Sequence, residues 1–366
     1  MRRICFVGVD NYLMLNSAST GAAVNGEAVQ QVLLARAFRD LGFEVSTVVA
    51  SSGGKIDEVI DSIRVLSAFE RGSGYPILRF LHPKMTGLFR CLKEVDADIY
   101  FQSPAAGLTG LTAAFCKRHS KIFIYRVASD VDCIPGKQLI ELWRDRRLFE
   151  FGLRNAHLVA TQSQYQQRLL DENYGLKSII ANMAVEEPIE SLDGPKEIDI
   201  LWISNLKSVK RVDRLLNIAA QLPEVRFAII GGVVIGEEDY FAEAESDAAK
   251  LPNVEFMGGL SYADVNQQIA KSKILVNTSE IEGFPNTFLQ AWIRKVPVVS
   301  FFDPDDIIVR HGLGRSPKSE DEMRSELSHL LKNRQLRNDM GVAARTYVAS
   351  RYSAISAAQQ YIEHCL

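Results

Sequence analysis

The stretch from residue 278 to residue 300 constrains this chain more than any other. Its sequence, TSEIEGFPNTFLQAWIRKVPVVS, predicts a loop, a helix and a buried strand in close succession. Pro285 suits the first helical position, because its missing N–H would be unpaired there anyway. The free N–H groups and the positive dipole end of such a helix can hold a phosphate. Glu282 lies just before this turn, and Gln290 shares a helix face with Asn286. An acid, an anion cradle and an amide therefore converge, which suits a nucleotide sugar.

The length and composition indicate a globular protein of about two domains. The chain has 366 residues, of which 47% are apolar and 24% charged, and a domain takes roughly 100–200 residues. A net charge of −3 argues against nucleic acid as the main partner. The five cysteines are odd in number and form no C-x-x-C pair, which favours a reduced, cytoplasmic compartment. The first apolar run stops at Asp10, too short for a signal peptide or a membrane span.

Apolar runs typical of strands alternate with helical patterns along the sequence, which predicts parallel sheets covered on both faces. Residues 184–198, which are acidic and carry two prolines and a glycine, interrupt this rhythm like an interdomain linker. We therefore expect an α/β protein with two Rossmann-like, doubly wound domains that face a cleft, with ligands at the carboxyl ends of the strands. The expected strands are Ile4–Val9, Glu44–Val49, Asp98–Gln102, Ile122–Val127, Leu158–Thr161, Asp199–Ser204, Val225–Gly231, Val254–Met257 and Lys273–Asn277. The expected helices are Glu27–Leu41, Thr109–Arg118, Gln138–Asn155, Arg211–Leu222, Ala263–Lys271, 319–333 and 335–366.

The segment around Glu282 resembles the E-x7-E segment of the GT-B glycosyltransferases of family four, a large group of retaining enzymes. In that family an acid-Gly-Phe loop leads into a helix that carries a second glutamate. Glu282 stands at the first acid, where the resemblance implies contact with the sugar and its anomeric carbon. Gln290 stands at the second, so an amide replaces the carboxylate that would take the ribose hydroxyls.

The resemblance covers nearly the whole chain and implies how it is divided. Residues 1–185 would form an acceptor-side domain, residues 186–198 a linker, and residues 199–349 a domain that binds the nucleotide sugar. The last helix, within residues 350–366, would cross back onto the first domain. The implied activity is retaining, metal-independent transfer of a hexosyl group from a UDP- or GDP-sugar. A glycan or lipid-linked acceptor would receive it, in the synthesis of a surface polysaccharide or glycolipid.

The resemblance also places the donor diphosphate against loops of the second domain. Lys210 matches a family lysine that grips the diphosphate, and the catalytic candidates there are Lys210 and Glu282. Asn205 stands where the family has an arginine, and Lys207 or Arg211 would be the nearby replacements for that positive charge. The remaining donor-binding candidates are Gly232, at a strand end, and the residues of the helix start, Gly283, Phe284, Pro285, Asn286 and Thr287.

The first domain offers weaker candidates. The loop 20–26 carries small residues and ends in Asn25-Gly26, where the family has a Gly-Gly pair facing the sugar diphosphate. Asp130 matches a family aspartate near the acceptor and is a third catalytic candidate, although a turn or helix-cap role would explain it equally well. The two positions where the family often has histidines are occupied by Gln102 and Ala128.

An amphipathic segment in the first half of the chain could contact a membrane. Residues 137–154 are expected to form a helix with a basic side and three aromatic residues, Trp143, Phe149 and Phe151. Such a helix packs on a sheet with its charges in water, or lies on an anionic membrane as a peripheral contact. The six histidines are scattered and form no metal-binding motif, so we expect no metal and no cofactor.

Two other functions stay open at this stage. One is a different GT-B enzyme, such as a sugar-nucleotide epimerase or an inverting transferase. The other is a non-catalytic GT-B-like protein that only binds a partner. Asn205, Gln290 and the absent histidines favour this last interpretation, since each departs from the family pattern.

Overall fold

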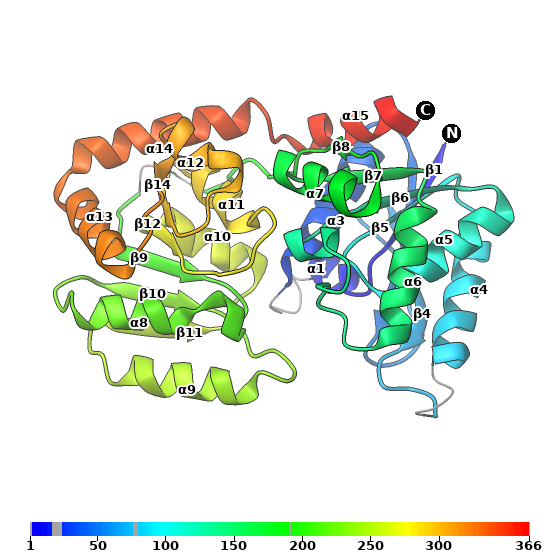
Figure 1. The fold of residues 1–366 in the computed structure, drawn as a ribbon, viewed down its shortest axis with the longest axis horizontal. Coiled ribbons are helices and arrows are strands. Elements are labelled where there is room, and N and C mark those ends of the chain that lie inside the picture. The colour runs from blue at the N-terminus through cyan, green and yellow to red at the C-terminus, as the bar shows by residue number, and fades with distance from the viewer. Residues whose placement is uncertain (1, 17–23, 76–79, 191, 193, 366) are drawn as a thin grey trace. The chain divides into compact units, whose positions relative to one another are not determined.

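The computed structural model of the chain describes residues 2–16, 24–75, 80–190, 192 and 194–365. These residues form two compact units. Unit 1 contains residues 2–16, 24–184 and 354–365, so the last helix belongs to the same unit as the amino terminus. Unit 2 contains the described residues between 185 and 353. Each unit is a sheet with helices packed on it (Figure 1).

The described residues of unit 1 form an eight-stranded sheet with the order β3-β4-β2-β1-β5-β6-β7-β8. Every neighbouring pair is parallel except β3 and β4, which form an antiparallel hairpin at one edge. The chain builds outward from β1 in both directions, so β1 and β5 flank a topological switch point, the position where ligands bind in such sheets. The strands are β1 (Arg3–Val7), β2 (Glu44–Ser51), β3 (Asp57–Ile60), β4 (Ile63–Glu70), β5 (Ile99–Gln102), β6 (Ile122–Arg126), β7 (Leu158–Thr161) and β8 (Ile179–Ile180).

Helices cover both faces of this sheet because its strands are apolar on both sides. On one face Phe6 of β1 packs edge-on against Phe38 of α3, and Phe101 of β5 packs against Tyr361 of α15. On the other face Cys5 joins a core formed with α4, α5 and α6. The helices of unit 1 are α1 (Asn11–Leu15), α3 (Gly26–Asp40), α4 (Thr86–Val95), α5 (Gly107–His119), α6 (Trp143–Arg154), α7 (Gln164–Tyr174) and α15 (Ala354–Cys365).

Two glycines let α5 and α6 pack unusually closely. A Cβ atom on Gly110 would lie 2.2 Å from the carbonyl oxygen of Leu148, and one on Gly152 would lie 2.6 Å from the carbonyl carbon of Thr109. The expected helix over 138–155 begins only at Trp143. The preceding residues form turns because the Gln138 side chain bonds to the backbone of Gly136 and Ile134, in competition with helical hydrogen bonds.

The described residues of unit 2 form a six-stranded, fully parallel sheet with the order β11-β10-β9-β12-β13-β14. Its switch point lies between β9 and β12. Helix α8 packs against α9 and α13, while α11 packs against α10 and α14. The strands are β9 (Ile198–Ile203), β10 (Phe227–Ile230), β11 (Val254–Gly258), β12 (Ser272–Asn277), β13 (Val298–Ser300) and β14 (Gly314–Arg315). The helices are α8 (Val212–Ala220), α9 (Glu238–Ala249), α10 (Tyr262–Ala270), α11 (Asn286–Ile293), α12 (Ile307–Arg310), α13 (Glu320–Lys332) and α14 (Arg334–Ala349).

Two further expectations about helix ends need correction. Pro285 is the N-cap of α11 and not its first helical residue, because its ψ of 122° is extended. The helix expected over 335–366 is broken into α14 and α15. The break lies where Val185 forms a β-bridge with Ser353, which takes the backbone out of the helical conformation.

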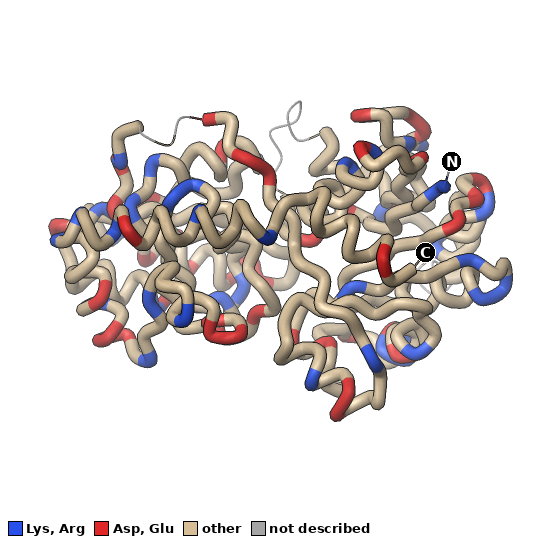
Figure 2. The backbone as a smooth tube through the Cα atoms, turned by 90° about the horizontal axis from the view of Figure 1, so that it is seen from above, with Lys and Arg blue, Asp and Glu red and all other residues tan. Residues whose placement is uncertain are grey.

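Figure 2 shows basic and acidic residues interspersed along the backbone of each unit. This interspersed pattern agrees with the small net charge of −3. In the described parts of the chain, none of the helices combines the length and the apolar character that crossing a membrane requires.

Candidate functional site

The strongest candidate site lies at the switch point of unit 2, where two loops leave neighbouring strands. The loop after β9 carries Lys210, and the loop after β12 carries Glu282. The Lys210 Nζ atom lies 2.8 Å from Glu282 Oε2, and the two side chains are 20% and 12% exposed. Lys210 Nζ also donates a hydrogen bond to the Ile281 carbonyl oxygen at 3.3 Å. Two residues that the sequence assigns to catalysis are therefore in direct contact.

Buried groups below this pair fix the backbone of Lys210. The Thr278 hydroxyl donates to the Lys210 carbonyl oxygen at 2.9 Å, and it accepts from Trp202 Nε1 at 2.9 Å. Both Thr278 and Trp202 are buried. The two loops are also joined by a backbone hydrogen bond from Glu280 to Val209. Sequence reasoning missed Thr278 and Trp202, which are 76 residues apart and become partners only through the pairing of β9 with β12.

A second buried residue orients the carboxylate of Glu282. Asn277, the last residue of β12, donates from Nδ2 to Glu282 Oε1 at 3.0 Å. Its own Oδ1 accepts from the Ser279 N–H at 2.9 Å, which fixes the amide. Both oxygens of Glu282 thus have partners, one on Lys210 and one on Asn277. Sequence reasoning missed Asn277 as well, although a polar residue that ends a buried strand is a signal for such a role.

The other residues of the Lys210 loop have different surroundings. Arg211 has a positive φ of 54°, and its guanidinium pairs with Asp213 and Glu280. Hydrogen bonding to Asp213 raises the pKa of Arg211, and these two carboxylates already compensate its charge. Asn205 is exposed, and Lys207 is half-buried. Arg211 thus has two acidic partners within the protein.

The start of α11 lies directly after Glu282 and is held by aromatic packing. Phe284 is buried and packs against Trp292 and Tyr352, with ring centroids 6.4 and 5.7 Å away. Gly283 and Pro285 are buried as well, whereas the first-turn residues, Asn286 and Thr287, are half-buried.

Gln290 is buried between two helices of unit 2. It is 6% exposed, and its Nε2 donates to Asn266 Oδ1 of α10 at 3.1 Å. Burial raises the pKa of Tyr262, on the same helix α10, to about 12. Gln290 thus belongs to a polar network between α10 and α11.

The two glycines after β10, Gly231 and Gly232, have different surroundings. A Cβ atom on Gly231 would lie 2.1 Å from the Ser204 carbonyl oxygen, so only glycine allows the two strand ends to approach this closely. Gly232 is more open, since a Cβ atom there would have Gly259 as its nearest neighbour, 3.9 Å away. The carbonyl of Gly232 accepts the Leu206 N–H, which ties it to the Lys210 loop.

The candidate residues of unit 1 form hydrogen bonds with residues of that unit. Asn25 is the N-cap of α3: its Oδ1 accepts from the Ala28 N–H at 2.8 Å, and its Nδ2 donates to Asp10. Gly26 is the first residue of that helix. Residues 20–23 of the preceding loop lie outside the described part of the chain.

Asp130 accepts a hydrogen bond from Gln166 Nε2 at 2.9 Å. The cap role that was an alternative for Asp130 is performed by Asp132, which accepts from the backbone N–H groups of Ala128 and Ser129. Burial raises the pKa of Asp132 to about 7, although these two N–H groups oppose the shift. Among the described residues, no three His, Cys, Asp or Glu side chains lie together as a metal site would need.

Two family models match the chain and together span most of it. The model described as Glycosyltransferase Family 4 matches residues 24–183, and the model described as Glycosyl transferases group 1 matches residues 186–347. The first match falls within unit 1 and the second within unit 2. The chain belongs to the GT-B glycosyltransferases of family four.

Solved structures show the same two-domain fold. Sucrose-phosphate synthase from Thermosynechococcus elongatus superposes with a TM-score of 0.77 at 14% identity, over 99% of this chain and 98% of that chain. Anabaena HepE, solved with UDP and glucose, superposes with a TM-score of 0.74 at 18% identity, over 99% of each chain. WaaG, a glycosyltransferase involved in lipopolysaccharide biosynthesis, gives a TM-score of 0.67 at 16% identity, over 99% of each chain.

Two curated relatives match part of the chain. An uncharacterized glycosyltransferase of Methanocaldococcus jannaschii is 22% identical over 204 residues, which are 54% of this chain and 56% of the relative. The poly(ribitol-phosphate) alpha-N-acetylglucosaminyltransferase of Staphylococcus aureus is 27% identical over 170 residues, 44% of this chain and 34% of the relative. The matched regions thus span about half and about a third of these relatives.

Proposed function

We propose that the protein is a retaining, metal-independent glycosyltransferase that moves a hexosyl group from a UDP- or GDP-sugar to a glycan or lipid-linked acceptor. The observation that carries the proposal is the contact between Lys210 and Glu282 at the switch point of unit 2. Family membership supports a nucleotide-sugar donor, and the relatives named for lipopolysaccharide and poly(ribitol-phosphate) support an acceptor in surface polysaccharide or glycolipid synthesis. Residues 199–349 would bind the donor, residues 1–185 the acceptor, and residues 186–198 would link them.

Glycosyl transfer breaks the bond between the anomeric carbon and the diphosphate, so negative charge builds on the leaving group. Lys210 and the first-turn amides of α11 would neutralise that charge from positions fixed before the reaction. Glu282, held by Asn277, would face the sugar as positive charge develops near its anomeric carbon. Preformed donors of this kind allow the reaction without a divalent metal.

The ribose of the donor would be bound by Gln290. Its Nε2 already donates to Asn266, so the amide is oriented, and its oxygen can accept from one ribose hydroxyl. Asn205, Arg211, Gly232, Asn25 and Gly26 complete the proposed donor contacts.

We expect UDP or GDP to stabilise the protein without added metal. A ligand that binds only the folded state raises the free energy of unfolding by about 2.7 kcal/mol at a hundredfold excess over Kd. Thermal unfolding with each nucleotide, in a chelator and then with magnesium or manganese, measures this. Stabilisation that needs the metal would contradict metal independence, and no stabilisation by any nucleoside diphosphate would favour a non-catalytic binding protein. An epimerase is distinguished by a separate assay with a UDP- or GDP-sugar, which it would consume without transfer or hydrolysis of the sugar.

The same titration on Gln290→Glu provides a control for the ribose contact. We expect affinity to stay equal or rise by about 0.5–1.5 kcal/mol, the scale of one hydrogen bond. The Asn266 amide can rotate to donate to the new carboxylate, so the variant should fold. A folded Gln290→Glu protein that no longer binds nucleotide would remove Gln290 from the donor site.

We also propose that the protein is cytoplasmic and that unit 1 makes a peripheral contact with the inner face of an anionic membrane, which would place it near lipid-linked acceptors. Three apolar side chains at the start of α6 are exposed, Trp143 by 76% and Leu139 and Leu142 by more than half. The guanidinium carbon of Arg144 lies 3.7 Å from the centre of the Phe80 ring. The segment around Phe80, which also has an exposed apolar residue, therefore lies beside the start of α6. Basic and apolar side chains together suit an anionic lipid surface.

Sedimentation with phosphatidylglycerol vesicles tests this contact. We expect binding that phosphatidylcholine vesicles do not reproduce and that Trp143→Ser weakens several-fold, because an exposed Trp anchors at the interface. Tyr165→Ser on α7, also an exposed aromatic, is the matched control. Equal binding by Trp143→Ser and the native protein would remove α6 as the contact.

A further inference from the structure

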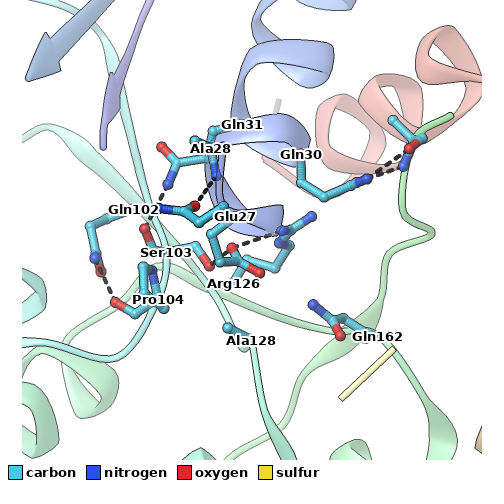
Figure 3. A network of polar contacts seen from close by, with 12 residues as sticks. Glu27, Ala28, Gln30, Gln31, Gln102, Ser103, Pro104, Arg126, Ala128 and Gln162 are labelled. Carbon is cyan, nitrogen blue, oxygen red and sulfur yellow. Dashed lines mark hydrogen bonds and ion pairs between the residues drawn. The ribbon is translucent and has the colours of Figure 1, made fainter. Parts of the chain in front are cut away.

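The carboxyl end of the unit 1 sheet, at the switch point between β1 and β5, gathers buried polar side chains (Figure 3). Buried polar groups are costly unless they are hydrogen-bonded, so such a cluster needs an explanation. Each member is at most 2% exposed: Asn11, Gln30, Gln31, Gln102, Ser103 and Arg126.

Hydrogen bonds within this cluster join the start of α3 to the loop after β5. Gln31 Nε2 donates to the Ser103 carbonyl oxygen at 2.6 Å, and Gln31 Oε1 accepts from Asn11 Nδ2 at 3.1 Å. Gln102 turns back and donates to the Pro104 carbonyl oxygen at 2.7 Å. The second turn of α3 and the loop after β5 are therefore held in one fixed arrangement.

Several polar atoms of this cluster nevertheless have no partner among the described residues. They include Nε and Nη1 of Arg126 and the side-chain oxygen of Gln102. Their concentration at the strand ends, where ligands bind in doubly wound sheets, points to a binding site and not to a packed core.

Glu27 is the member of this network that reaches the surface. Its side chain is 22% exposed, and its Oε2 accepts from Ser103 Oγ at 2.5 Å and from Arg126 Nη2 at 2.9 Å. Burial disfavours the charged form of Arg126, but the Glu27 carboxylate raises the pKa of Arg126, which stays protonated. Because Ser103 and Arg126 both contact Oε2, the other carboxylate oxygen, Oε1, is the acceptor that a ligand can meet.

We propose that Glu27 binds the acceptor, accepting a hydrogen bond through Oε1 from one of its hydroxyl groups. This inference rests on the proposed glycosyltransferase function. The ligand class is a sugar or polyol hydroxyl, because an ionised carboxylate can only accept and its charge is already matched by Arg126. Gln102 and Ala128 occupy the neighbouring strand ends, and the first is buried while the second has no polar side chain. The competing explanation is that Glu27 serves only as counter-ion to Arg126.

The test uses the full chain and measures release of nucleoside diphosphate from UDP-glucose, UDP-galactose, UDP-N-acetylglucosamine and GDP-mannose. Each donor is assayed in water alone and with p-nitrophenyl glycosides as acceptors. We expect Glu27→Gln to lower turnover per folded molecule at least tenfold and to leave UDP or GDP affinity unchanged. Glu44→Gln, the same change at an exposed residue at the amino end of β2, should have no effect.

The counter-ion explanation is separated by repeating Glu27→Gln in an Arg126→Met background, where no buried cation remains to be matched. The tenfold loss persists there if Glu27 binds an acceptor hydroxyl, and it disappears if Glu27 only balances Arg126. The acceptor role is overturned if the native protein turns over a donor and Glu27→Gln leaves that turnover unchanged, both alone and in the Arg126→Met background. A native protein that releases no nucleotide from any donor overturns the proposed function itself.

Discussion

Glu282→Gln is expected to lower kcat by about two orders of magnitude and to change nucleoside diphosphate affinity little, because the lost charge acts on the transition state. The substitution keeps the shape of the side chain, but its amide has a single oxygen, which can accept from Asn277 or from Lys210 and not from both. With Asn277 bonded to that oxygen, the Lys210 ammonium loses its partner and is available to the diphosphate. Turnover, nucleotide affinity and melting temperature on this one variant separate catalysis from structure.

Glu280→Gln is the matched control for that measurement. Glu280 lies two residues earlier in the same loop, is about half exposed, and pairs with Arg211. Loss of its charge should leave kcat within a small factor of the native value. Near-normal kcat in a well-folded Glu282→Gln protein would take Glu282 out of the mechanism.

Lys210→Ala is expected to lower kcat/KM by roughly a hundredfold or more, the scale of one preorganised charge partner in the transition state. The change also leaves Glu282 without its cation while that side chain is only 12% exposed, so some stability is lost and rates must be given per folded molecule. Steady-state kinetics with the donor, alongside circular dichroism of the same preparation, make the measurement.

Lys207→Ala tests whether position or general positive charge matters. Lys207 lies on the same loop, but it is Lys210 that contacts Glu282 and Ile281. Removal of the Lys207 side chain should therefore change kcat/KM far less. Equal losses in the two variants would mean that the loop acts by its overall charge. Because Lys210 and Glu282 touch, their double variant should lose less than the two single effects combined.

Long periodic segments and the residues at strand ends could be predicted from the sequence alone. The resemblance named Lys210 and Glu282 as catalytic candidates, but their ion pair was found only in the structure, where the loops that carry them leave adjacent parallel strands. The hairpin of β3 and β4 could not be predicted, because its turn residues, Asp61 and Ser62, both have positive φ without the glycine that usually marks such a turn.

The supporting contacts needed the fold because they join distant parts of the chain. Trp202 and Thr278 are separated by 76 residues, and Glu27 and Arg126 by 99. The sequence around each of these residues contains no local pattern that predicts its hydrogen-bond partner. Gln138 illustrates the opposite error, since its side-chain bonds to nearby backbone override a helical periodicity that looked continuous.

The anchoring of Lys210 through Thr278 to Trp202 has an entropic consequence for donor binding. A mobile loop that closed on its ligand would lose backbone freedom at the moment of binding, roughly 1–2 kcal/mol for each residue that becomes ordered. Here the conformational freedom of the Lys210 backbone is already lost when the protein folds. The lysine side chain is held as well, by Glu282 and by the Ile281 carbonyl, so binding of a diphosphate orders little and more of the contact energy is available as affinity.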